Sequence, residues 1–515
     1  MGGFYPGPSL APTKTVSPKQ RRLLVVSNRL PIVLEKKESG WALKPGSGGL
    51  VSALAPVLSH RGGVWIGWPG LALEKGGTWE DVLADGYRER GYDLVPVLLS
   101  ADEVHGFYEG FANAILWPLF HDFLGRCDFQ PSFWYTYLQV SRKFADATIE
   151  HSQEDDFIWV QDYQLIHVAQ FMRERTTETR RIGFFLHIPF PPLDIFLKLP
   201  WRGQILNALL AYDLLGFQTA RDSRNFLTCL QYLLPEIEVC DSGPLAGVRV
   251  GHRTVNVGAF PIGIDYKSYE ETALSEEVAR RTEDLRKRMG PCPLIIGVDR
   301  LDYTKGLPER LEAFRSLLRR YPEMREKAIF LQVVVPSREG VPEYQALKAH
   351  IERLVGEING EFSVAGWVPL HYHYKSLGRR DLIALYRLAR IAFVTSIKDG
   401  MNLVAKEFCA CQVDKCGVLV LSEFAGAAAQ LQRGALLVNP HDIEGMADAL
   451  KQGLEMDGDE RRMRMEIMQE VLREQDIFWW VDNYLRAALG EVPEDFRQPK
   501  EYFPPVAVYE ALLEE

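Results

Sequence analysis

The chain has 515 residues, of which 47% are hydrophobic and 25% are charged, and its formal net charge is −10. This length allows two to four domains with large cores. The negative charge argues against a nucleic-acid partner. No apolar run reaches the roughly 18 residues that a membrane span requires. The composition therefore predicts an ordinary soluble globular protein that binds neither nucleic acid nor membranes.

The N-terminal 22 residues are rich in proline, glycine, serine and threonine and lack the apolar segment of a secretion signal. We therefore expect a disordered tail on a cytoplasmic protein. The cysteine count of seven is odd, which indicates reduced thiols. Cys409, Cys411 and Cys416 lie close together, but no fourth metal ligand follows at a suitable spacing. Buried structural thiols are the preferred interpretation, and no metal is expected.

The first half of the chain alternates apolar runs with helical segments. Continuous apolar runs, which are typical of buried parallel strands, occupy residues 23–27, 64–68, 158–160, 183–186, 214–217 and 254–257. Polar residues closely follow three of these runs, namely Arg29, Asp162 and His187. Open α/β sheets bind their ligands at the carboxyl ends of the strands. We therefore expect these three side chains to line a ligand site.

The first half also contains a glycine-rich turn and an aromatic segment. A glycine-rich turn at residues 45–49 precedes a predicted helix over residues 50–58. Glycines let the backbone approach a phosphate closely, although such a turn is as often a plain loop. Residues 107–121 are dense in aromatic side chains without helical periodicity, and core packing is their simplest explanation.

The second half repeats the alternation. Its predicted strands are residues 294–298, 329–335, 391–396, 418–421 and 436–438, and helices begin near Pro308, Asp381 and Asp442. Neither half has a GxGxxG motif after its first strand, so a dinucleotide cofactor is not expected. Two successive α/β units predict two Rossmann-like domains that face a central cleft.

These patterns divide the chain into a tail and two domains. Residues 1–22 form the tail, residues 23–258 the N-terminal Rossmann-like domain, and residues 259–485 the C-terminal Rossmann-like domain. An aromatic helix around residues 478–485 is expected to cross back to the first domain. About residues 486–515 would then pack there.

The segment 394–408 combines a β-branched run, a turn at Asp399-Gly400 and a predicted helix from Met401 to Phe408. The first N–H groups of a helix have no partner within the helix and therefore bind anions. Asp399 and Glu407 flank this site, and two carboxylates beside an anion site suggest a nucleotide-sugar. The alternative is an N-capping aspartate followed by a solvated helical glutamate.

Sequence blocks spread over residues 23–450 resemble those of the trehalose-phosphate synthases, which are retaining glycosyltransferases of the GT-B fold. The blocks include VVSNRLP, GGLVSAL, FANAILWPLFH, QDYQL, FFLHIPFPP, DRLDYTKGLPERL, PSREGVPEY and KDGMNLVAKEF. This resemblance implies transfer of glucose from UDP-glucose, or another nucleoside-diphosphate glucose, to glucose 6-phosphate. The product would be α,α-trehalose 6-phosphate. No cofactor is implied, a homo-oligomer is allowed, and a separate phosphatase would release trehalose.

The resemblance also implies roles for individual residues. Arg300 and Lys305 would neutralise the leaving diphosphate in place of a metal ion. The implied catalytic residues are His187, Arg300, Lys305 and Asp399. The implied donor-binding residues are Gly48, Gly49, Arg300, Lys305, Leu377, Asp399, Gly400, Met401, Asn402, Leu403, Val404 and Glu407. The implied acceptor-binding residues are Arg29, Tyr108, Trp117, Asp162 and Arg338.

The chain departs from the family pattern at a few positions. Gln161 and Gln164 stand where the family usually has histidines, from which we expect tuning of the site at most. Leu377 replaces a phenylalanine of some members, which suggests a backbone contact to the base. Two alternatives remain open: a synthase with another acceptor, giving glucosylglycerol phosphate or a pseudo-disaccharide phosphate, and a non-catalytic subunit that senses sugar phosphate.

Overall fold

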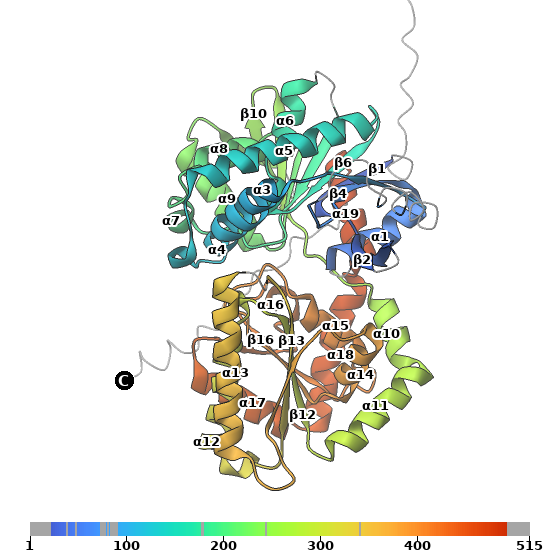
Figure 1. Cartoon of the computed structure of the whole chain (residues 1–515), viewed down its shortest axis with the longest axis vertical. Coiled ribbons are helices and arrows are strands. Elements are labelled where there is room, and N and C mark those ends of the chain that lie inside the picture. Colours follow the sequence, from blue (N-terminus) through green and yellow to red (C-terminus); the bar gives the residue numbers. More distant parts are fainter. Residues whose placement is uncertain are drawn as a thin grey trace, which may run out of the picture.

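The computed structural model describes residues 22–37, 40–46, 49–72, 79, 82, 91–176, 180–242, 245–338 and 341–491. Two α/β halves lie one above the other, with the N-terminal half at the top of Figure 1 and the C-terminal half below it. Apart from Arg22, the predicted tail lies outside the described residues, as do residues 492–515 of the predicted returning segment. None of the described helices is both long and apolar enough to cross a lipid bilayer.

Within the described residues, the N-terminal half contains a nine-stranded sheet and a small separate hairpin. In spatial order the strands of the sheet are β5 (Asp93–Pro96), β4 (Gly63–Trp68), β1 (Leu23–Arg29), β6 (Phe157–Gln161), β7 (Arg181–Phe185), β8 (Leu214–Phe217), β11 (Arg253–Ala259), β10 (Leu245–Val250) and β9 (Glu238–Ser242). Neighbours pair in parallel from β5 to β11, whereas β10 and β9 are antiparallel additions at the edge. The hairpin pairs β2 (Ile32–Lys37) with β3 (Gly40–Pro45).

Helices cover both faces of this sheet, which explains why its strands are apolar on both sides. On β1, Leu24 and Val26 pack with the aromatic core of the π-helix η2 (Val104–Leu116) and of α5 (Pro131–His151), while Leu23 and Val25 face the opposite layer. The other helices among the described residues of this half are α1 (Gly49–Arg61), α3 (Ala101–Glu103), α4 (Trp117–Phe120), η3 (Leu124–Arg126), η4 (Tyr163–Leu165), α6 (Val168–Arg175), α7 (Leu193–Phe196), α8 (Arg202–Leu209) and α9 (Ala220–Leu233).

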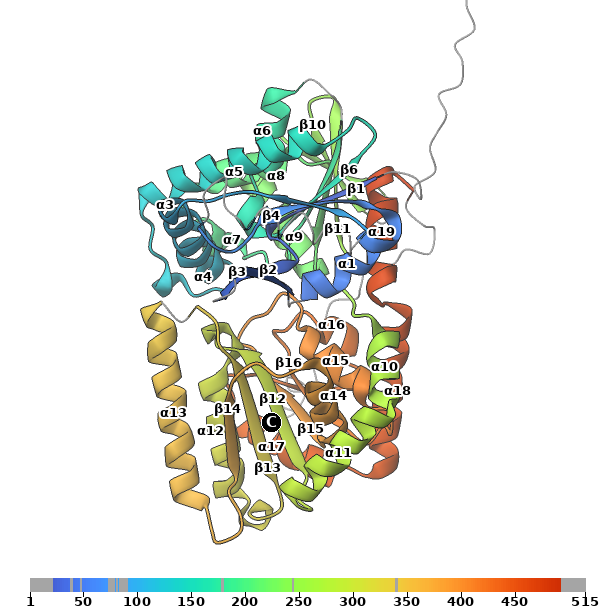
Figure 2. The same cartoon turned by 45° about the vertical axis from the view of Figure 1, so that its right-hand side comes forward.

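The described part of the C-terminal half contains a parallel six-stranded sheet. Its strands, in spatial order, are β14 (Leu370–Tyr374), β13 (Ile329–Val335), β12 (Leu294–Arg300), β15 (Ile391–Val394), β16 (Val418–Ser422) and β17 (Leu436–Val438). The helices α12 (Leu307–Arg320), α13 (Pro342–Phe362) and α17 (Ile443–Glu455) pack together on one side. The opposite side carries α10 (Tyr266–Leu274), α11 (Glu276–Met289), α14 (Arg379–Leu388), α15 (Leu403–Cys411) and α18 (Gly458–Glu474), as Figure 2 shows. The short elements are η5 (Tyr303–Lys305), η6 (Pro322–Met324) and α16 (Ala428–Leu431).

Over the part of the chain that the structure describes, the backbone passes between the halves twice. Helix α19 (Ile477–Leu489) returns to the N-terminal half, where Tyr484 stacks on Trp159 with ring centroids 4.3 Å apart and donates to the Phe184 carbonyl over 2.9 Å. The predicted crossing helix is thereby confirmed. The first passage, residues 260–265, is fixed by Lys406, whose buried ammonium donates to the Ile262 carbonyl over 2.6 Å.

Several local predictions need correction. The strand predicted to end at Ser396 ends at Val394, although Thr395 and Ser396 are buried beyond it. The helix predicted from Met401 begins at Leu403 and is capped by the side chain of Asn402, so the alternative of an N-capping Asp399 is wrong. Residues 104–116 lack a 3.6-residue periodicity because they form a π-helix, which has a wider turn. Cys409 and Cys411 are buried in α15 as predicted, whereas Cys416 is exposed.

Candidate active site

The candidate site lies where the carboxyl ends of the two parallel sheets face each other. The turn that contains Gly400 reaches across to the N-terminal half, and its α-carbon packs against the carbonyl of His187 and the backbone of Ile188. A side chain at position 400 would collide with these atoms. The two halves therefore meet directly at this turn.

Asp399 is held at the centre of the donor side. Its Oδ2 accepts from the Lys305 ammonium over 2.6 Å, from the Asn402 amide over 3.1 Å and from the Ser396 hydroxyl over 3.2 Å. Burial alone would raise the pKa of Asp399, but Lys305 and Asn402 together bring it below its ordinary value. Asp399 is therefore an ionised, fully oriented acceptor for hydroxyl groups.

Two helix N-termini meet beside Asp399. Asn402 has a φ of 95° and accepts the Ala405 N–H over 3.0 Å, which leaves the first N–H groups of α15, those of Leu403 and Val404, without intrahelical acceptors. Gly49, the first residue of α1, lies against the Leu403 side chain, which would have to shift if position 49 carried a Cβ. The two helix dipoles thus point their positive ends at one place, which favours a diphosphate. Gly48 lies outside the described residues.

Glu407 lies one turn further along α15 and accepts from two tyrosine hydroxyls. The Tyr269 hydroxyl is 2.9 Å from Oε1 and the Tyr386 hydroxyl is 3.4 Å from Oε2. Burial raises the pKa of Glu407 to about 7, in spite of these two hydrogen bonds. Leu377 is half-buried at the end of the segment that leads into α14.

The cations of the donor side come from the end of β12 and the turn after it. Arg300 is exposed as the last residue of the strand, and Lys305 closes η5. Gly306 follows with a φ of 62°, in the left-handed region where glycine is favoured. Behind them the fully buried Arg310 joins Asp299 over 2.6 Å and the Thr395 hydroxyl over 2.9 Å. This buried ion pair fixes the ends of β12 and β15 relative to each other.

Arginines and aromatic rings define the acceptor side. The Arg29 guanidinium lies 4.2 Å from the Trp68 ring centroid and 5.3 Å from that of Tyr108. Arg338, from the C-terminal half, lies 4.6 Å from the ring centroid of Trp117, and Arg300 lies 5.9 Å from it. Trp117 therefore contacts cations of the opposite half.

Three of these arginines act together on the pKa of the Tyr108 phenol. Burial would raise the pKa of its phenol, but Arg338, Arg29 and Arg300 act together to lower the pKa below the ordinary value. Burial would lower the pKa of Arg338, but Asp302, which lies 3.6 Å away, and the surrounding tyrosines raise it above its ordinary value, so the guanidinium stays protonated. Three guanidinium groups around one phenol form a strongly anion-attracting corner.

Asp162 occupies the junction between the two sides. Its φ of 74° is unusual for a non-glycine residue, and its Oδ1 accepts the N–H groups of Tyr163 over 3.0 Å and of His187 over 3.1 Å. Burial raises the pKa of Asp162 to about 7, although these two hydrogen bonds and Arg300 oppose the change.

The ring of His187 is enclosed by two glutamines. The Gln218 Oε1 takes the Ile262 N–H over 3.0 Å, so its amide nitrogen faces the His187 Nδ1 over 3.4 Å as a donor. The His187 proton must then lie on Nε2, which donates to the Gln161 Oε1 over 2.9 Å. Burial lowers the pKa of His187 to about 3, so the ring is neutral and is not arranged for proton transfer. Gln161, one of the departures noted above, thereby fixes the tautomer.

The sequence of the chain matches the pattern of glycosyltransferase family 20 over residues 21–489. The chain belongs to glycosyltransferase family 20. Among its relatives, a trehalose-6-phosphate synthase of Mycobacterium avium (strain 104) is 42% identical over 492 residues, which cover 94% of this chain and 98% of the relative. Another, from Mycobacterium sp. (strain JLS), is 43% identical over 470 residues, or 90% of this chain and 95% of the relative.

Solved structures support the same family assignment. A UDP-forming α,α-trehalose-phosphate synthase from Burkholderia xenovorans, in complex with glucose-6-phosphate, has a TM-score of 0.81 and 37% identity, with 91% of this chain and 100% of that chain covered. An E. coli structure with bound UDP-2-fluoro glucose has a TM-score of 0.80 and 36% identity, with 92% and 100% covered. The predicted GT-B fold and the predicted glycosyltransferase class are both confirmed.

In this family 20 enzyme, sequence reasoning missed a histidine of the site. His121 ends the block FANAILWPLFH, and its Nδ1 donates to the Trp117 carbonyl over 2.8 Å. Because a carbonyl only accepts, Nε2 keeps its lone pair. Burial lowers the pKa of His121 to about 4, while the charges of Asp302, Asp399 and Lys305 also act on it. Its place at the end of a family block, after the candidate Trp117, was the available signal.

Proposed function

We propose that the protein transfers glucose from UDP-glucose, or another nucleoside-diphosphate glucose, to glucose 6-phosphate with retention of configuration. The product is α,α-trehalose 6-phosphate. The observation that carries this proposal is the opposition of two anion sites across one cleft. Three arginines surround Tyr108 on one side, and the N-termini of α1 and α15 meet beside Lys305 and Asp399 on the other.

On the donor side, the helix N-termini, Arg300 and Lys305 bind the diphosphate, since this corner supplies unpaired N–H groups and fixed cations. Asp399 accepts hydroxyl groups of the glucose, and Glu407 those of the ribose. Gly400, Met401 and Asn402 shape the turn around the sugar, and Leu377 offers its backbone to the base.

On the acceptor side, Arg29 and Arg338 bind the 6-phosphate as forked donors. Their guanidinium groups are already held on aromatic faces, so little side-chain entropy is lost on binding. Trp117 forms a wall for the acceptor sugar, and Asp162 accepts one of its hydroxyls. Both halves contribute to this subsite, because Arg338 belongs to the C-terminal half.

Transfer proceeds on the face from which the diphosphate departs. The anomeric hydroxyl of the acceptor attacks the anomeric carbon of the donor while the bond to the diphosphate breaks. The proton passes to an oxygen of the leaving phosphate. Asp399 and Asp302 are engaged with Lys305 and Arg338, which makes either a poor covalent nucleophile. Arg300 and Lys305 stabilise the developing negative charge, and His187 contacts the transferred glucose near its reacting carbon.

The test is a product analysis. The protein is incubated with UDP-, ADP- or GDP-glucose and either glucose 6-phosphate or, in a parallel series, glycerol 3-phosphate. The phosphorylated product is identified by mass spectrometry and NMR. A disaccharide phosphate with two α-anomeric signals supports the proposal. A glucosylglycerol phosphate formed from glycerol 3-phosphate would support the alternative synthase. Absence of any transfer with all donors would contradict enzymatic function of this kind.

We further propose that the reaction needs no cofactor and takes place in the cytoplasm. A phosphatase has to act on the product before the free disaccharide is released, because the product keeps the acceptor's phosphate.

A further inference from the structure

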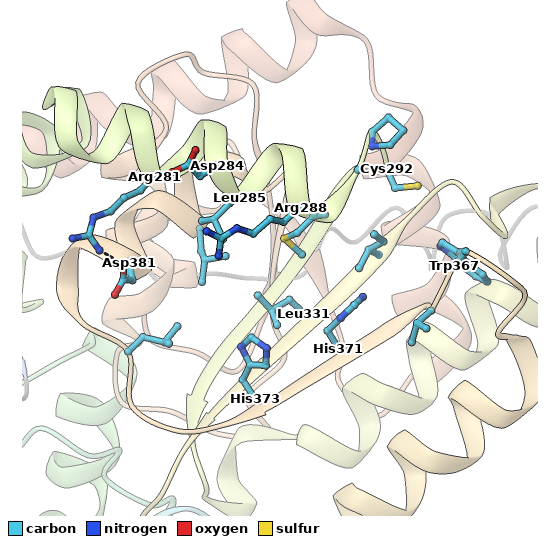
Figure 3. Close-up of a pocket in the computed structure, with 18 of the residues that line it drawn as sticks. Arg281, Asp284, Leu285, Arg288, Cys292, Leu331, Trp367, His371, His373 and Asp381 are labelled. Atoms are coloured by element: carbon cyan, nitrogen blue, oxygen red, sulfur yellow. Dashed lines mark hydrogen bonds and ion pairs between the residues drawn. The ribbon is translucent and has the colours of Figure 1, made fainter.

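A large cavity lies in the C-terminal half, outside the cleft. Its volume is about 890 Å³, and it opens between α11 and the strands β13 and β14 (Figure 3). On this side of the sheet α11 packs on α14 rather than on β14, so the outer part of the sheet is left uncovered. Ligand sites are commonly concave and mostly apolar, with a few polar groups that orient the ligand.

The floor of the cavity is apolar and well ordered by packing. Leu331 of β13 and Trp367 are 2% and 6% exposed, and Leu385 of α14 is 6% exposed. The Trp367 indole N–H is already engaged, since it donates to the Ala328 carbonyl over 3.2 Å. The floor is therefore apolar but largely covered, and the apolar surface open to a ligand includes Val368, which is 44% exposed.

The rim carries basic side chains. Arg288 points over the cavity from α11, and His371 and His373 lie on β14, as Figure 3 shows. Lys375 follows directly after the end of β14 and also lines the cavity. Within the described residues, Arg288 and Lys375 form no ion pair, while the His373 Nδ1 is enclosed by protein and has no hydrogen bond. Arg281 differs, because Glu277 and Asp381 already neutralise it. Asp284 also lines the cavity, and Asp381 is paired with Arg281. Arg288 and Lys375 therefore supply the positive charge above the apolar floor, and they complement an anion that carries an apolar group.

The cavity also borders the donor side of the active site. Leu377, the proposed contact of the nucleotide base, and Asp381 and Leu385 of α14 all line it. The next residue of α14, Tyr386, donates to Glu407, the proposed ribose contact. A ligand in the cavity would therefore press on the segment that positions two donor contacts.

We propose that this cavity is a second binding site, which takes a small organic anion with an apolar body and thereby modulates binding of the nucleotide-sugar. The modulation rests on the proposed function, whereas the binding does not. The anionic group lies at Arg288 and Lys375, and the apolar body covers Leu331 and Trp367. Coupling arises because occupied and empty cavities favour different positions of α14.

The binding test uses anilinonaphthalene sulfonate, an aromatic anion whose fluorescence rises in apolar surroundings. The full chain is titrated with the probe in the presence of saturating UDP. Arg288→Ser and Lys375→Ser should each weaken probe binding about tenfold, as expected for loss of one charge-assisted contact. Arg286→Ser is the matched control, because Arg286 lies on the same helix, pairs with Glu283 and does not line the cavity.

A cavity-filling variant provides an independent check. His371→Trp places an indole in the cavity and should abolish probe binding while the thermal melting curve stays cooperative. Equal probe affinity in the wild type, Arg288→Ser and His371→Trp would overturn the site. Complete displacement of the probe by UDP, together with unchanged binding in these variants, would assign the probe to the donor subsite and overturn it as well.

The coupling is tested by enzyme kinetics. The probe should change the KM for UDP-glucose in the wild type and in Arg286→Ser but not in Arg288→Ser. An unchanged KM in the wild type at saturating probe would overturn the regulatory part. Failure of the proposed function would look different, because transfer would then be missing while probe binding kept its dependence on Arg288 and Lys375.

Discussion

The two sides of the cleft hold their charged groups in different ways. On the donor side, Lys305 and Asp399 form a direct ion pair of 2.6 Å, with side chains only 13% and 14% exposed. On the acceptor side, Arg29 and Arg338 rest on the rings of Trp68 and Trp117. The donor side thus relies on a direct ion pair. On the acceptor side both arginines lie on aromatic faces, and Arg338 has a carboxylate, that of Asp302, at the longer distance of 3.6 Å.

This difference has a chemical consequence. An ion pair in a partly dry site keeps both groups ionised and oriented, which suits charge stabilisation during bond cleavage. A guanidinium on an aromatic face keeps its N–H edge available, which suits recognition of a phosphate that must also leave with the product. The donor side is therefore built for catalysis and the acceptor side for reversible binding.

The largest effect is expected from breaking the donor ion pair. Lys305→Ala should lower kcat about 100-fold or more, because it removes a cation that stabilises the leaving diphosphate and leaves Asp399 unpaired. Steady-state kinetics with UDP-glucose and glucose 6-phosphate measure this. Lys415→Ala, at a surface pair with Glu466, serves as the control. Turnover close to that of the wild type would contradict the role of Lys305.

A smaller effect is expected on the acceptor side. Arg338→Lys keeps the charge but loses the fork, so the KM for glucose 6-phosphate should rise about tenfold with little change in the KM for the donor. Arg142→Lys is the control, because Arg142 also lies on an aromatic face, that of Phe171 at 4.4 Å, but outside the site. Equal rises in both KM values would mean that Arg338 supports the whole cleft rather than the acceptor.

Contacts between the two sides should matter less. Lys398, next to Asp399, forms an ion pair with Asp122 of the N-terminal half, and Tyr303 packs edge-on to Phe123 at 5.0 Å. Asp122→Asn should lower kcat/KM roughly threefold, the value of a partly exposed ion pair. Asp122→Lys and Lys398→Asp each reverse one charge of the pair and should each lower kcat/KM. The variant that combines them should recover part of these losses, as a double-mutant cycle measures. Purely additive losses would show that the pair does not couple the two halves.

The smallest effect concerns stability and pH. Burial raises the pKa of Asp162 to about 7, well above its value in an unfolded chain. Between about pH 4 and 7 the folded state keeps a proton that the unfolded state has released, so this group's contribution to the unfolding free energy falls as pH rises. Asp162→Asn removes the contribution, so its Tm relative to that of the wild type should be higher at pH 8 than at pH 5. Burial also raises the pKa of Glu407, so the contribution of Glu407 to the unfolding free energy likewise falls as pH rises. Burial lowers the pKa of Lys406, so its contribution rises with pH. Both contributions are present in the wild type and the variant and cancel when the two are compared. A difference in Tm that does not vary with pH would refute the assignment.

Much of the fold followed from the sequence because its signals are local. Continuous apolar runs marked strands that are buried on both faces, and polar residues after them marked the carboxyl ends where Arg29, Asp162 and His187 lie. The π-helix over residues 104–116 was not predicted, because its periodicity matches neither a strand nor an α-helix. The N-cap of α15 was not predicted, because no neighbouring residue indicates that Asn402 adopts a positive φ.

The sequence by itself determined the fold class, the family and the types of residue that serve the cleft. Only the tertiary structure decided which of these residues lie close to one another. Arg338 completes the acceptor corner from the other half, Gly49 brings the start of α1 to the start of α15, and Gln218 with Gln161 sets the tautomer of His187. The cavity beside β14 likewise depends on where α11 crosses the sheet. The physical reason is that periodicity encodes which face of an element is buried, while contacts between distant segments depend on how whole elements pack.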